Sequence, residues 1–287
     1  MLNFFVTGGA GFIGSNFICR ALELLNCRVI NIDKLTYSGN LDNLSHLIDS
    51  PNYNFHQVDI NNFDVIKSLM VRYKPDVLIN FAAESHVDRS IDTPSLFIET
   101  NVLGTQNLLD ASLDYWKDKN KDFKFIHIST DEVYGSLGDE GLFTEETAYS
   151  PSSPYSASKA SSDHFVDAWH KTYGLPVIIT NCSNNYGPMQ FPEKLIPLMI
   201  INALSERKLP IYGDGKNIRD WIHVYDHCDA ILSIIENGKI GEKYNIGGNC
   251  ELQNIDIVNI ICQKLDKKKR RKNEEPYSSL IEFVEDR

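Results

Sequence analysis

The sequence lacks several features that would assign it to common classes of protein. No apolar run is long enough to span a bilayer, so we expect no membrane-crossing segment. Basic residues are few, because 28 Lys and Arg stand against 39 Asp and Glu and give a net charge of −11. This balance argues against nucleic acids and anionic membranes as main partners.

Cysteine is also scarce, and its spacing excludes the usual metal motifs. The six cysteines are scattered without paired spacing, so we predict free thiols in a reducing cytoplasm and no metal site. His223 and His227 lie four residues apart, but no carboxylate-flanked helix motif accompanies them. A strand is expected from residue 2, which leaves no room for a signal peptide.

What the chain does contain is a regular alternation of strand and helix patterns over its first 180 residues. This alternation predicts an α/β fold, a Rossmann-type doubly wound parallel sheet with helices on both faces. From residue 181 to 287 prolines break the pattern, which indicates a smaller C-terminal substrate-binding domain. The predicted strands are 2–7, 28–32, 53–58, 77–81, 123–129 and 177–181, and the predicted helices are 15–25, 61–72, 94–116 and 153–173.

A glycine-rich turn follows the first strand and opens the first helix. Gly8, Gly11 and Gly14 form a Gly-x-x-Gly-x-x-Gly run, overlapped by the Gly-x-Gly-x-x-Gly pattern from Gly9. Glycines there permit a tight turn and let the backbone approach a pyrophosphate at the helix N-terminus. Asp33 ends the second strand about 20 residues later, where ribose hydroxyls are held. Its carboxylate would repel a 2′-phosphate, so NAD is favoured over NADP.

Two further clusters carry acid–base chemistry. Tyr155 and Lys159 lie four residues apart and so share one helix face. An ammonium beside a phenol favours the phenolate, so we expect Tyr155 to take a proton from a hydroxyl near neutral pH. Thr130 is followed by two carboxylates, Asp131 and Glu132, which simple alcohol oxidation does not need. The chemistry indicated is oxidation combined with a further proton transfer, such as an elimination.

The motifs as a group resemble the extended short-chain dehydrogenase/reductase family, and within it the nucleotide-sugar 4,6-dehydratases. The resemblance covers essentially the whole chain, and Thr-Asp-Glu is its most discriminating element. The matching segments are TGGAGFIGSN (7–16), NIDKLTYSGNL (31–41), NFAAESHVDRSI (80–91), ISTDEVYG (128–135), SPYSASKASSDH (153–164), NCSNNYGP (181–188), FPEKLIPL (191–198), LPIYGDG (209–215), RDW (219–221) and YNIGG (244–248).

The resemblance implies catalytic roles. Tyr155 would take the C4 hydroxyl proton of the sugar while hydride leaves C4 for NAD, and Thr130 would hydrogen-bond the C4 oxygen. Lys159 would tune Tyr155 and hold the nicotinamide ribose. Glu132 would remove the C5 proton, and Asp131 would protonate the departing C6 hydroxyl. The hydride would return to C6, giving a 4-keto-6-deoxy sugar.

The resemblance also implies binding residues. The NAD site would comprise Gly8, Gly11, Phe12, Ile13, Gly14, Asp33, Lys34, Thr36, Asp59, Ile60, Ala82, Ala83, Ser85, Thr100, Tyr155, Lys159 and Asn184. The nucleotide-sugar site, with dTDP-glucose as the implied substrate, would comprise Ser85, Thr130, Asn185, Lys194, Leu195, Pro210, Tyr212, Arg219, Asn254 and Arg287. Arg and Lys suit a diphosphate, and Tyr212 suits stacking on a base.

Several alternatives stay open on the sequence. A 4-epimerase would share the cofactor and the Tyr–Lys pair but would not need the two carboxylates. A non-catalytic NAD-binding protein would not need Thr130, Tyr155 and Lys159 together. Both dTDP and UDP present a pyrimidine. The two long helices suggest a homodimer interface, as in related enzymes. Members of the family continue well past residue 287, so we expect either a truncated chain or an unusual gene product.

Overall fold

The computed structural model describes residues 1–119, 122–137 and 141–285 and divides into two compact units. The first unit comprises Met1–Cys182 and Val224–Ile246, and the second comprises Ser183–His223 and Gly247–Arg287. The predicted boundary at residue 180 lies at the first crossing between them. Residues 224–246, which sequence analysis placed in the second half, return to the first unit. None of the described helices has the length and apolar character needed to cross a membrane.

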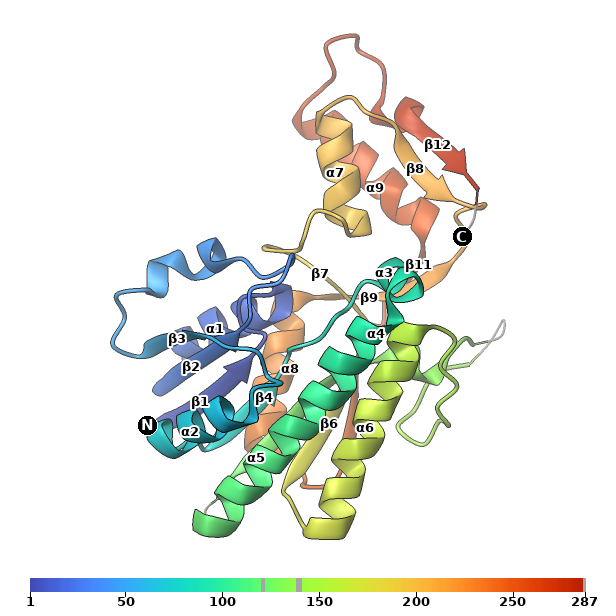
Figure 1. Ribbon diagram of the computed structural model, residues 1–287. Coiled ribbons are helices and arrows are strands. Elements are labelled where there is room, and N and C mark those ends of the chain that lie inside the picture. Colours follow the sequence, from blue (N-terminus) through green and yellow to red (C-terminus); the bar gives the residue numbers. More distant parts are fainter. Residues whose placement is uncertain (120–121, 138–140, 286–287) are drawn as a thin grey trace. The chain divides into compact units, whose positions relative to one another are not determined.

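The first unit is built on a seven-stranded parallel sheet with the order β10-β6-β5-β4-β1-β2-β3 (Figure 1). The order reverses beside β1, as in a doubly wound fold, so the predicted fold class is confirmed. The strands are β1 (Leu2–Thr7), β2 (Cys27–Asp33), β3 (Tyr53–Gln57), β4 (Val77–Asn80), β5 (Lys124–Thr130), β6 (Val177–Cys182) and β10 (Lys243–Ile246).

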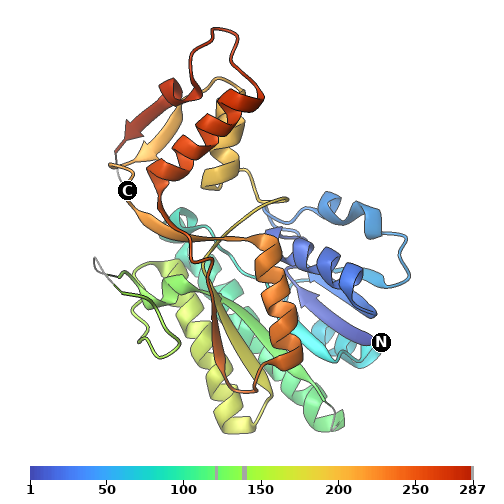
Figure 2. The same cartoon turned by 180° about the vertical axis from the view of Figure 1, so that it is seen from behind.

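Helices cover both faces of this sheet. On one face α5 packs against α2 and α6, and on the other α1 packs against α8 (Figures 1 and 2). Their inward faces and the strands form a core of fully buried residues such as Phe5, Ile30 and Leu78. The helices are α1 (Phe12–Leu24), α2 (Phe63–Tyr73), α3 (Val87–Asp92), α4 (Pro94–Phe97), α5 (Gly104–Lys119), α6 (Pro154–Tyr173) and α8 (Val224–Asn237), with shorter turns η1 (Leu41–Leu47), η2 (Ile98–Leu103) and η3 (Asp131–Tyr134).

The long helix predicted over 94–116 is present but contains one irregular turn. The segment η2 has π-helical hydrogen bonding between α4 and α5. The carbonyl of Asn101 accepts a hydrogen bond from the Ser162 hydroxyl of α6, which competes with the regular helical pattern. The Asn101 side chain donates to the Ser158 Oγ, 2.8 Å away. The irregular turn therefore joins this helix to the first half of α6.

The second unit contains two small sheets and two helices. The sheets have the orders β11-β9-β7 and β12-β8, and their core includes Trp221, Val258 and Tyr277. Pro197 does not break the chain as predicted, because it lies in the first turn of α7, where a backbone N–H is not needed. The elements are β7 (Asn184–Tyr186), α7 (Leu195–Leu204), β8 (Leu209–Tyr212), β9 (Ile218–His223), β11 (Glu251–Gln253), α9 (Asn254–Lys268), η4 (Tyr277–Leu280) and β12 (Ile281–Val284).

Candidate active site

The glycine-rich turn after β1 makes a tight cradle at the N-terminus of α1. Gly8 has a φ of +69°, and a Cβ there would lie 2.6 Å from the Ala82 backbone nitrogen. A Cβ on Gly14 would collide with the Gly8 carbonyl oxygen. The N-cap of α1 is Gly11, which offers no side-chain oxygen to the first-turn N–H groups. Such an end suits an anionic group, so the local structure fits a dinucleotide pyrophosphate.

Asp33 at the end of β2 is tied into this turn. Its two carboxylate oxygens accept hydrogen bonds from the backbone N–H of Ala10, at 2.9 Å, and of Leu35, at 2.8 Å. Burial raises the pKa of Asp33, whereas these hydrogen bonds and the charge of Lys34 lower it. The carboxylate is fixed next to the glycine turn, which is the position that the NAD prediction requires.

Three of the other predicted NAD residues lie together. Lys34 Nζ donates to Thr100 Oγ1 at 3.2 Å and lies 3.5 Å from an Asp59 carboxylate oxygen. Ile60 fills the space beside Gly104, where a Cβ could not fit. The remaining predicted residues of the first unit start α1 or lie in the segments after β2 and β4: Phe12, Ile13, Thr36, Ala82, Ala83 and Ser85.

The predicted acid–base residues gather at the end of β5 and the start of α6. Thr130 is the last residue of β5; its Oγ1 donates to Asp131 at 3.2 Å and accepts the Glu132 N–H at 3.3 Å. Helix α6 starts at a capping box formed by Ser153 and Ser156, with Pro154 in its first turn. Tyr155 is thereby held in the first turn of α6.

Tyr155 is buried, and its neighbours oppose its ionisation. Burial, followed by the charge of Glu132, raises the pKa of Tyr155 well above its ordinary value, while a hydrogen bond with Thr130 lowers it. Because α6 packs against β5 and η3, Thr130, Asp131 and Glu132 act on the ionisation of Tyr155. We expected Lys159 to lower this pKa; the protein groups instead raise it, because burial and adjacent carboxylates both disfavour the phenolate.

Lys159 is also buried, with only 3% of its surface exposed. Its Nζ donates to the Ile128 carbonyl of β5 at 2.7 Å. Burial lowers the pKa of Lys159, and the charge of Asp163 is the largest effect in the opposite direction. Lys159 is thus anchored to the strand that leads into Thr130.

Two residues of this region are absent from the sequence-based predictions. Cys182, treated only as a free thiol, lies at the end of β6, and its charge would act on both Tyr155 and Lys159. Asp163 is fully buried and interacts with Lys159. The spacing of Tyr155, Lys159 and Asp163 at intervals of four was visible in the sequence and could have indicated Asp163. Nothing local indicated Cys182.

The remaining predicted residues belong to the second unit, which we describe by itself. The Nδ2 of Asn185 donates to the Ser183 carbonyl at 3.0 Å, and Arg219 in β9 is exposed. Tyr212 at the end of β8 is 43% exposed. Arg287 lies outside the described residues. The others are Asn184 in β7, Lys194 and Leu195 at the start of α7, Pro210 in β8 and Asn254 at the start of α9.

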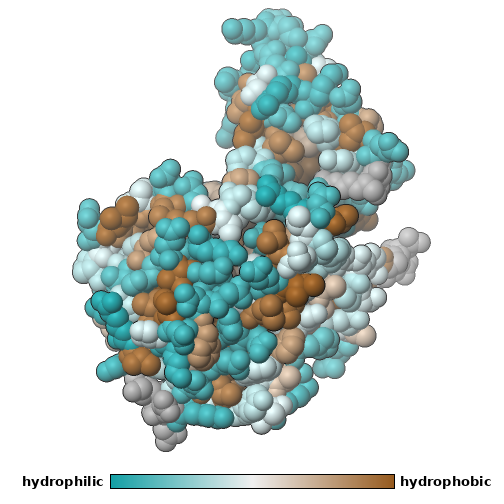
Figure 3. All heavy atoms as spheres, in the orientation of Figure 1, coloured by the Kyte–Doolittle hydropathy of each residue, from teal (hydrophilic) through white to brown (hydrophobic). Residues whose placement is uncertain are grey.

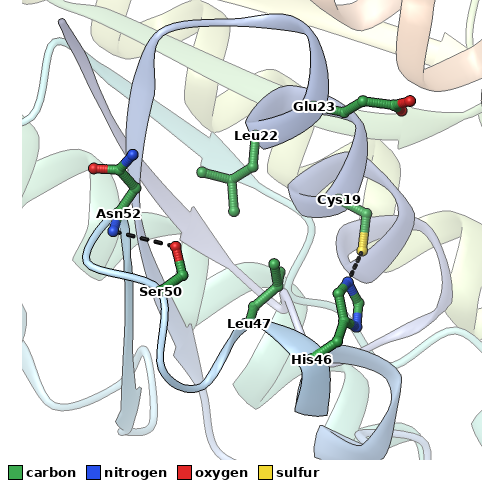
Figure 4. Close-up of a pocket in the computed structure, with 7 residues that line it drawn as sticks. All are labelled: Cys19, Leu22, Glu23, His46, Leu47, Ser50 and Asn52. Atoms are coloured by element: carbon green, nitrogen blue, oxygen red, sulfur yellow. Dashed lines mark hydrogen bonds between the residues drawn. The ribbon is translucent and has the colours of Figure 1, made fainter.

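A separate pocket of about 420 Å³ lies beside α1 and η1 (Figure 4). Within it Cys19 Sγ is 3.7 Å from His46 Nε2. Burial raises the pKa of Cys19, so the thiol form is favoured and the pair is not an activated nucleophile. No group of three or more potential metal ligands occurs in 1–119, 122–137 or 141–285.

Comparison with known proteins places this geometry in context. A family described as GDP-mannose 4,6 dehydratase matches residues 5–287. The chain is 55% identical to a dTDP-glucose 4,6-dehydratase of Xanthomonas campestris pv. campestris (strain B100), covering 100% of the chain and 83% of that relative.

Solved structures show the same similarity. A dTDP-glucose 4,6-dehydratase from Bacillus anthracis, in complex with NAD, superposes with a TM-score of 0.89 at 49% identity, covering 100% of this chain and 85% of that one. The dTDP-glucose 4,6-dehydratase of Streptomyces venezuelae, with NAD and TYD bound, superposes with a TM-score of 0.90 at 44% identity. The match covers 100% of this chain and 85% of that one. A UDP-glucose 4-epimerase from Thermotoga maritima superposes with a TM-score of 0.86 at only 26% identity. The match covers 100% of this chain and 86% of that one.

Proposed function

This chain belongs to the family described as GDP-mannose 4,6 dehydratase, and from that premise we propose that it is an NAD-dependent dTDP-glucose 4,6-dehydratase. The observation that carries the proposal is the gathering of Thr130, Asp131 and Glu132 around Tyr155. A simple dehydrogenase or epimerase needs the tyrosine, but its reaction contains no elimination in which two carboxylates would serve as acid and base. The relatives at 44–55% identity are dTDP-glucose 4,6-dehydratases, whereas the epimerase shares 26%.

The residues divide the reaction among them. When bound, NAD accepts the hydride from C4 and returns it at C6. Tyr155 takes the C4 hydroxyl proton, and Thr130 hydrogen-bonds the C4 oxygen. Lys159, held by the Ile128 carbonyl, supplies a positive charge that offsets part of the effect of burial and Glu132, which raise the pKa of Tyr155.

The elimination belongs to the two carboxylates. Glu132 removes the C5 proton, which the new C4 ketone has made acidic. Asp131, in its protonated form, gives its proton to the departing C6 hydroxyl, which leaves as water. As the hydride returns to C6, Glu132 gives its proton back to C5, and the product is the 4-keto-6-deoxy sugar.

For binding, we assign the cofactor to the first unit and the nucleotide part of the substrate to the second. The cradle at Gly8 and the fixed carboxylate of Asp33 support the NAD assignment. Lys194 and Arg219 provide charges suited to a diphosphate. The ring of Tyr212 is 43% exposed and has the chemistry to stack on a pyrimidine.

We also propose a homodimer formed through the two long helical stretches, the one from α4 through η2 to α5, and α6. Large apolar residues are exposed on α4 and η2, including Leu96, Ile98 and Leu103, and Figure 3 shows hydrophobic patches on this side of the first unit. A second copy of the chain would cover them. Leu103→Glu should convert the dimer to a monomer in sedimentation analysis. The six free cysteines support function in the cytoplasm.

The decisive experiment is incubation with dTDP-glucose followed by alkali. A 4-keto-6-deoxy product absorbs near-ultraviolet light, and an epimerised glucose does not. Tyr155→Phe serves as the inactive control, and UDP-glucose is assayed in parallel. A galactose-configured product without the chromophore would replace this proposal with the epimerase, and equal turnover of UDP-glucose would remove the dTDP assignment.

A further inference from the structure

A buried carboxylate lies on the catalytic face of α6, one turn beyond Lys159. Tyr155, Lys159 and Asp163 are spaced at intervals of four, so their side chains line the same face of the helix. Asp163 has no exposed surface, so water does not solvate its carboxylate. A buried carboxylate is costly unless hydrogen bonds and an opposite charge compensate it.

The hydrogen-bond donors around Asp163 come from three separate parts of the chain. Its Oδ2 accepts hydrogen bonds from Ser129 Oγ at 2.9 Å, Tyr149 Oη at 2.9 Å and Asn181 Nδ2 at 3.3 Å. Despite complete burial, the pKa of Asp163 lies below its ordinary value because His127, Lys159 and Ser129 favour the carboxylate. The three hydrogen bonds to its Oδ2 and the charge of Lys159 favour the carboxylate form of Asp163.

His127 lies beside this anion but does not neutralise it. Its Nε2 is 3.3 Å from Asp163 Oδ1, although the angle is not that of a directed hydrogen bond. The amide oxygen of Asn80 accepts the Thr7 hydroxyl at 2.7 Å, so the Asn80 amide nitrogen faces His127 Nδ1 at 3.3 Å. Nδ1 must then be an acceptor, which leaves the proton on Nε2. Burial and Lys159 lower the pKa of His127, which keeps the ring neutral.

Lys159 is then the cation that balances Asp163. Its ammonium is buried, it donates to the Ile128 carbonyl, and Asp163 is the main group that favours its charged form. We propose that Asp163 is a positioning residue, a buried carboxylate that keeps Lys159 charged on the helix face that carries Tyr155. This inference rests on the proposed role of Lys159 and deepens it.

The groups that face this pair limit how it can titrate. Lys159 is faced by Asp163 and Cys182, and Asp163 by Ser129, Tyr149, Asn181 and His127. Tyr149 is itself covered by Lys243, whose Nζ lies 4.5 Å from the ring centroid. Burial and Asp163 raise the pKa of Tyr149, so it stays a hydrogen-bond donor across the working pH range. Within the pair of Lys159 and Asp163, Lys159 is the group that loses a proton at alkaline pH.

The main test is Asp163→Asn, which keeps the shape and removes the charge. Without the anion Lys159 should deprotonate at lower pH, so the alkaline limb of kcat/KM should move down by about one pH unit or more. A purely structural loss would lower activity equally at all pH values. Ser129→Ala, which removes one hydrogen bond but keeps the charge, is the matched control and should leave the limb in place.

A second readout is independent of turnover. In protein with ¹³C-labelled lysine, the Lys159 Cε resonance, assigned by its absence in Lys159→Met, should titrate at lower pH in Asp163→Asn. An unshifted resonance and an unshifted limb would overturn the inference. Failure of the proposed function would instead appear in the wild type, as absence of the 4-keto-6-deoxy product.

If Asp163→Asn does not fold, the double variant Ser129→Ala/Tyr149→Phe keeps the inference testable. Loss of two donors should raise the pKa of the Asp163 carboxyl, so activity should fall at the acid end while the alkaline limb stays in place. An unchanged acid limb in this variant would contradict the inference.

Discussion

The guanidinium of Arg89 lies over the ring of Tyr37, with its central carbon 3.5 Å from the ring centroid. Tyr37 follows β2, and Arg89 is in α3, which follows β4. Because β1 lies between β4 and β2 in the sheet, this contact joins the two segments that flank the end of β1. The glycine turn that would receive the cofactor begins at that end.

Arg89→Ala should therefore release NAD faster than the wild type. A cation–π contact of this exposed kind is worth about 0.5–1 kcal/mol, which corresponds to a roughly two- to fivefold faster release. Stopped-flow displacement of bound NAD measures the rate. Arg89→Lys, which keeps a cation, should lie nearer the wild type, and an unchanged rate in Arg89→Ala would show that the contact has no part in cofactor retention.

Asp33 should give NAD a clear advantage over NADP. Its carboxylate is fixed by the N–H groups of Ala10 and Leu35, and a 2′-phosphate beside it would meet a negative charge. We expect at least about tenfold tighter binding of NAD by calorimetry, a difference of about 1.4 kcal/mol. Asp33→Asn should narrow this ratio, whereas Lys34→Ala should not. Equal wild-type affinities would show that Asp33 does not face the ribose.

The first half of the fold was predictable because its signals are local. Each strand of the sheet up to β6 was predicted within about two residues, since apolar runs and turn residues lie next to each other in the chain. The return of Val224–Ile246 to the first unit was not predictable. In this segment β10 pairs with β6 and α8 packs on α1, and both partners lie far away in the sequence. Such pairing depends on tertiary contacts that one sequence does not display.

The candidate site divides in the same way. The glycines, Thr130, Tyr155 and Lys159 were visible because helix spacing and strand ends identify them. The direction in which the pKa of Tyr155 shifts was not visible, because the shift depends on burial and on the approach of Glu132. The neutral state of His127 depends likewise on Asn80 and Thr7 in neighbouring strands.

His227 should make the protein less stable in mild acid. Burial lowers its pKa from 6.5 to about 4, so below pH 6.5 the unfolded chain binds a proton that the folded protein refuses. With respect to His227, the folded protein therefore keeps its full stability above pH 6.5 and loses stability as the pH drops toward 4. Between pH 7 and pH 5 the free energy of unfolding should fall by about 2 kcal/mol from this group.

Urea unfolding at the two pH values measures this loss. His227→Gln is less stable throughout, but its free energy of unfolding should change less with pH. Part of the pH dependence of the free energy of unfolding should remain in this variant, because burial also lowers the pKa of His127. His46→Gln, an exposed control, should follow the wild type, and an unchanged slope in His227→Gln would contradict the assignment.

Glu132→Gln and Asp131→Asn should stop the reaction after its first half. Oxidation at C4 depends on Tyr155 and Lys159, whereas loss of water across C5 and C6 needs the two carboxylates. Because Glu132 is the strongest charge that raises the pKa of Tyr155, its removal should lower that pKa and leave the first proton transfer unhindered. Turnover should fall by roughly 10²–10⁴-fold, as expected for loss of a general acid or base.

The variants should therefore accumulate enzyme-bound NADH with the 4-keto sugar, which is measured by absorbance in a single turnover. Tyr155→Phe provides the contrast, because it should bind NAD yet form no NADH at all. If the double variant Asp131→Asn/Glu132→Gln still released normal 4-keto-6-deoxy product, these carboxylates could not be the elimination pair. If it formed no NADH, the two carboxylates would be required for C4 oxidation itself, and the division of labour between them and Tyr155 would have to be abandoned.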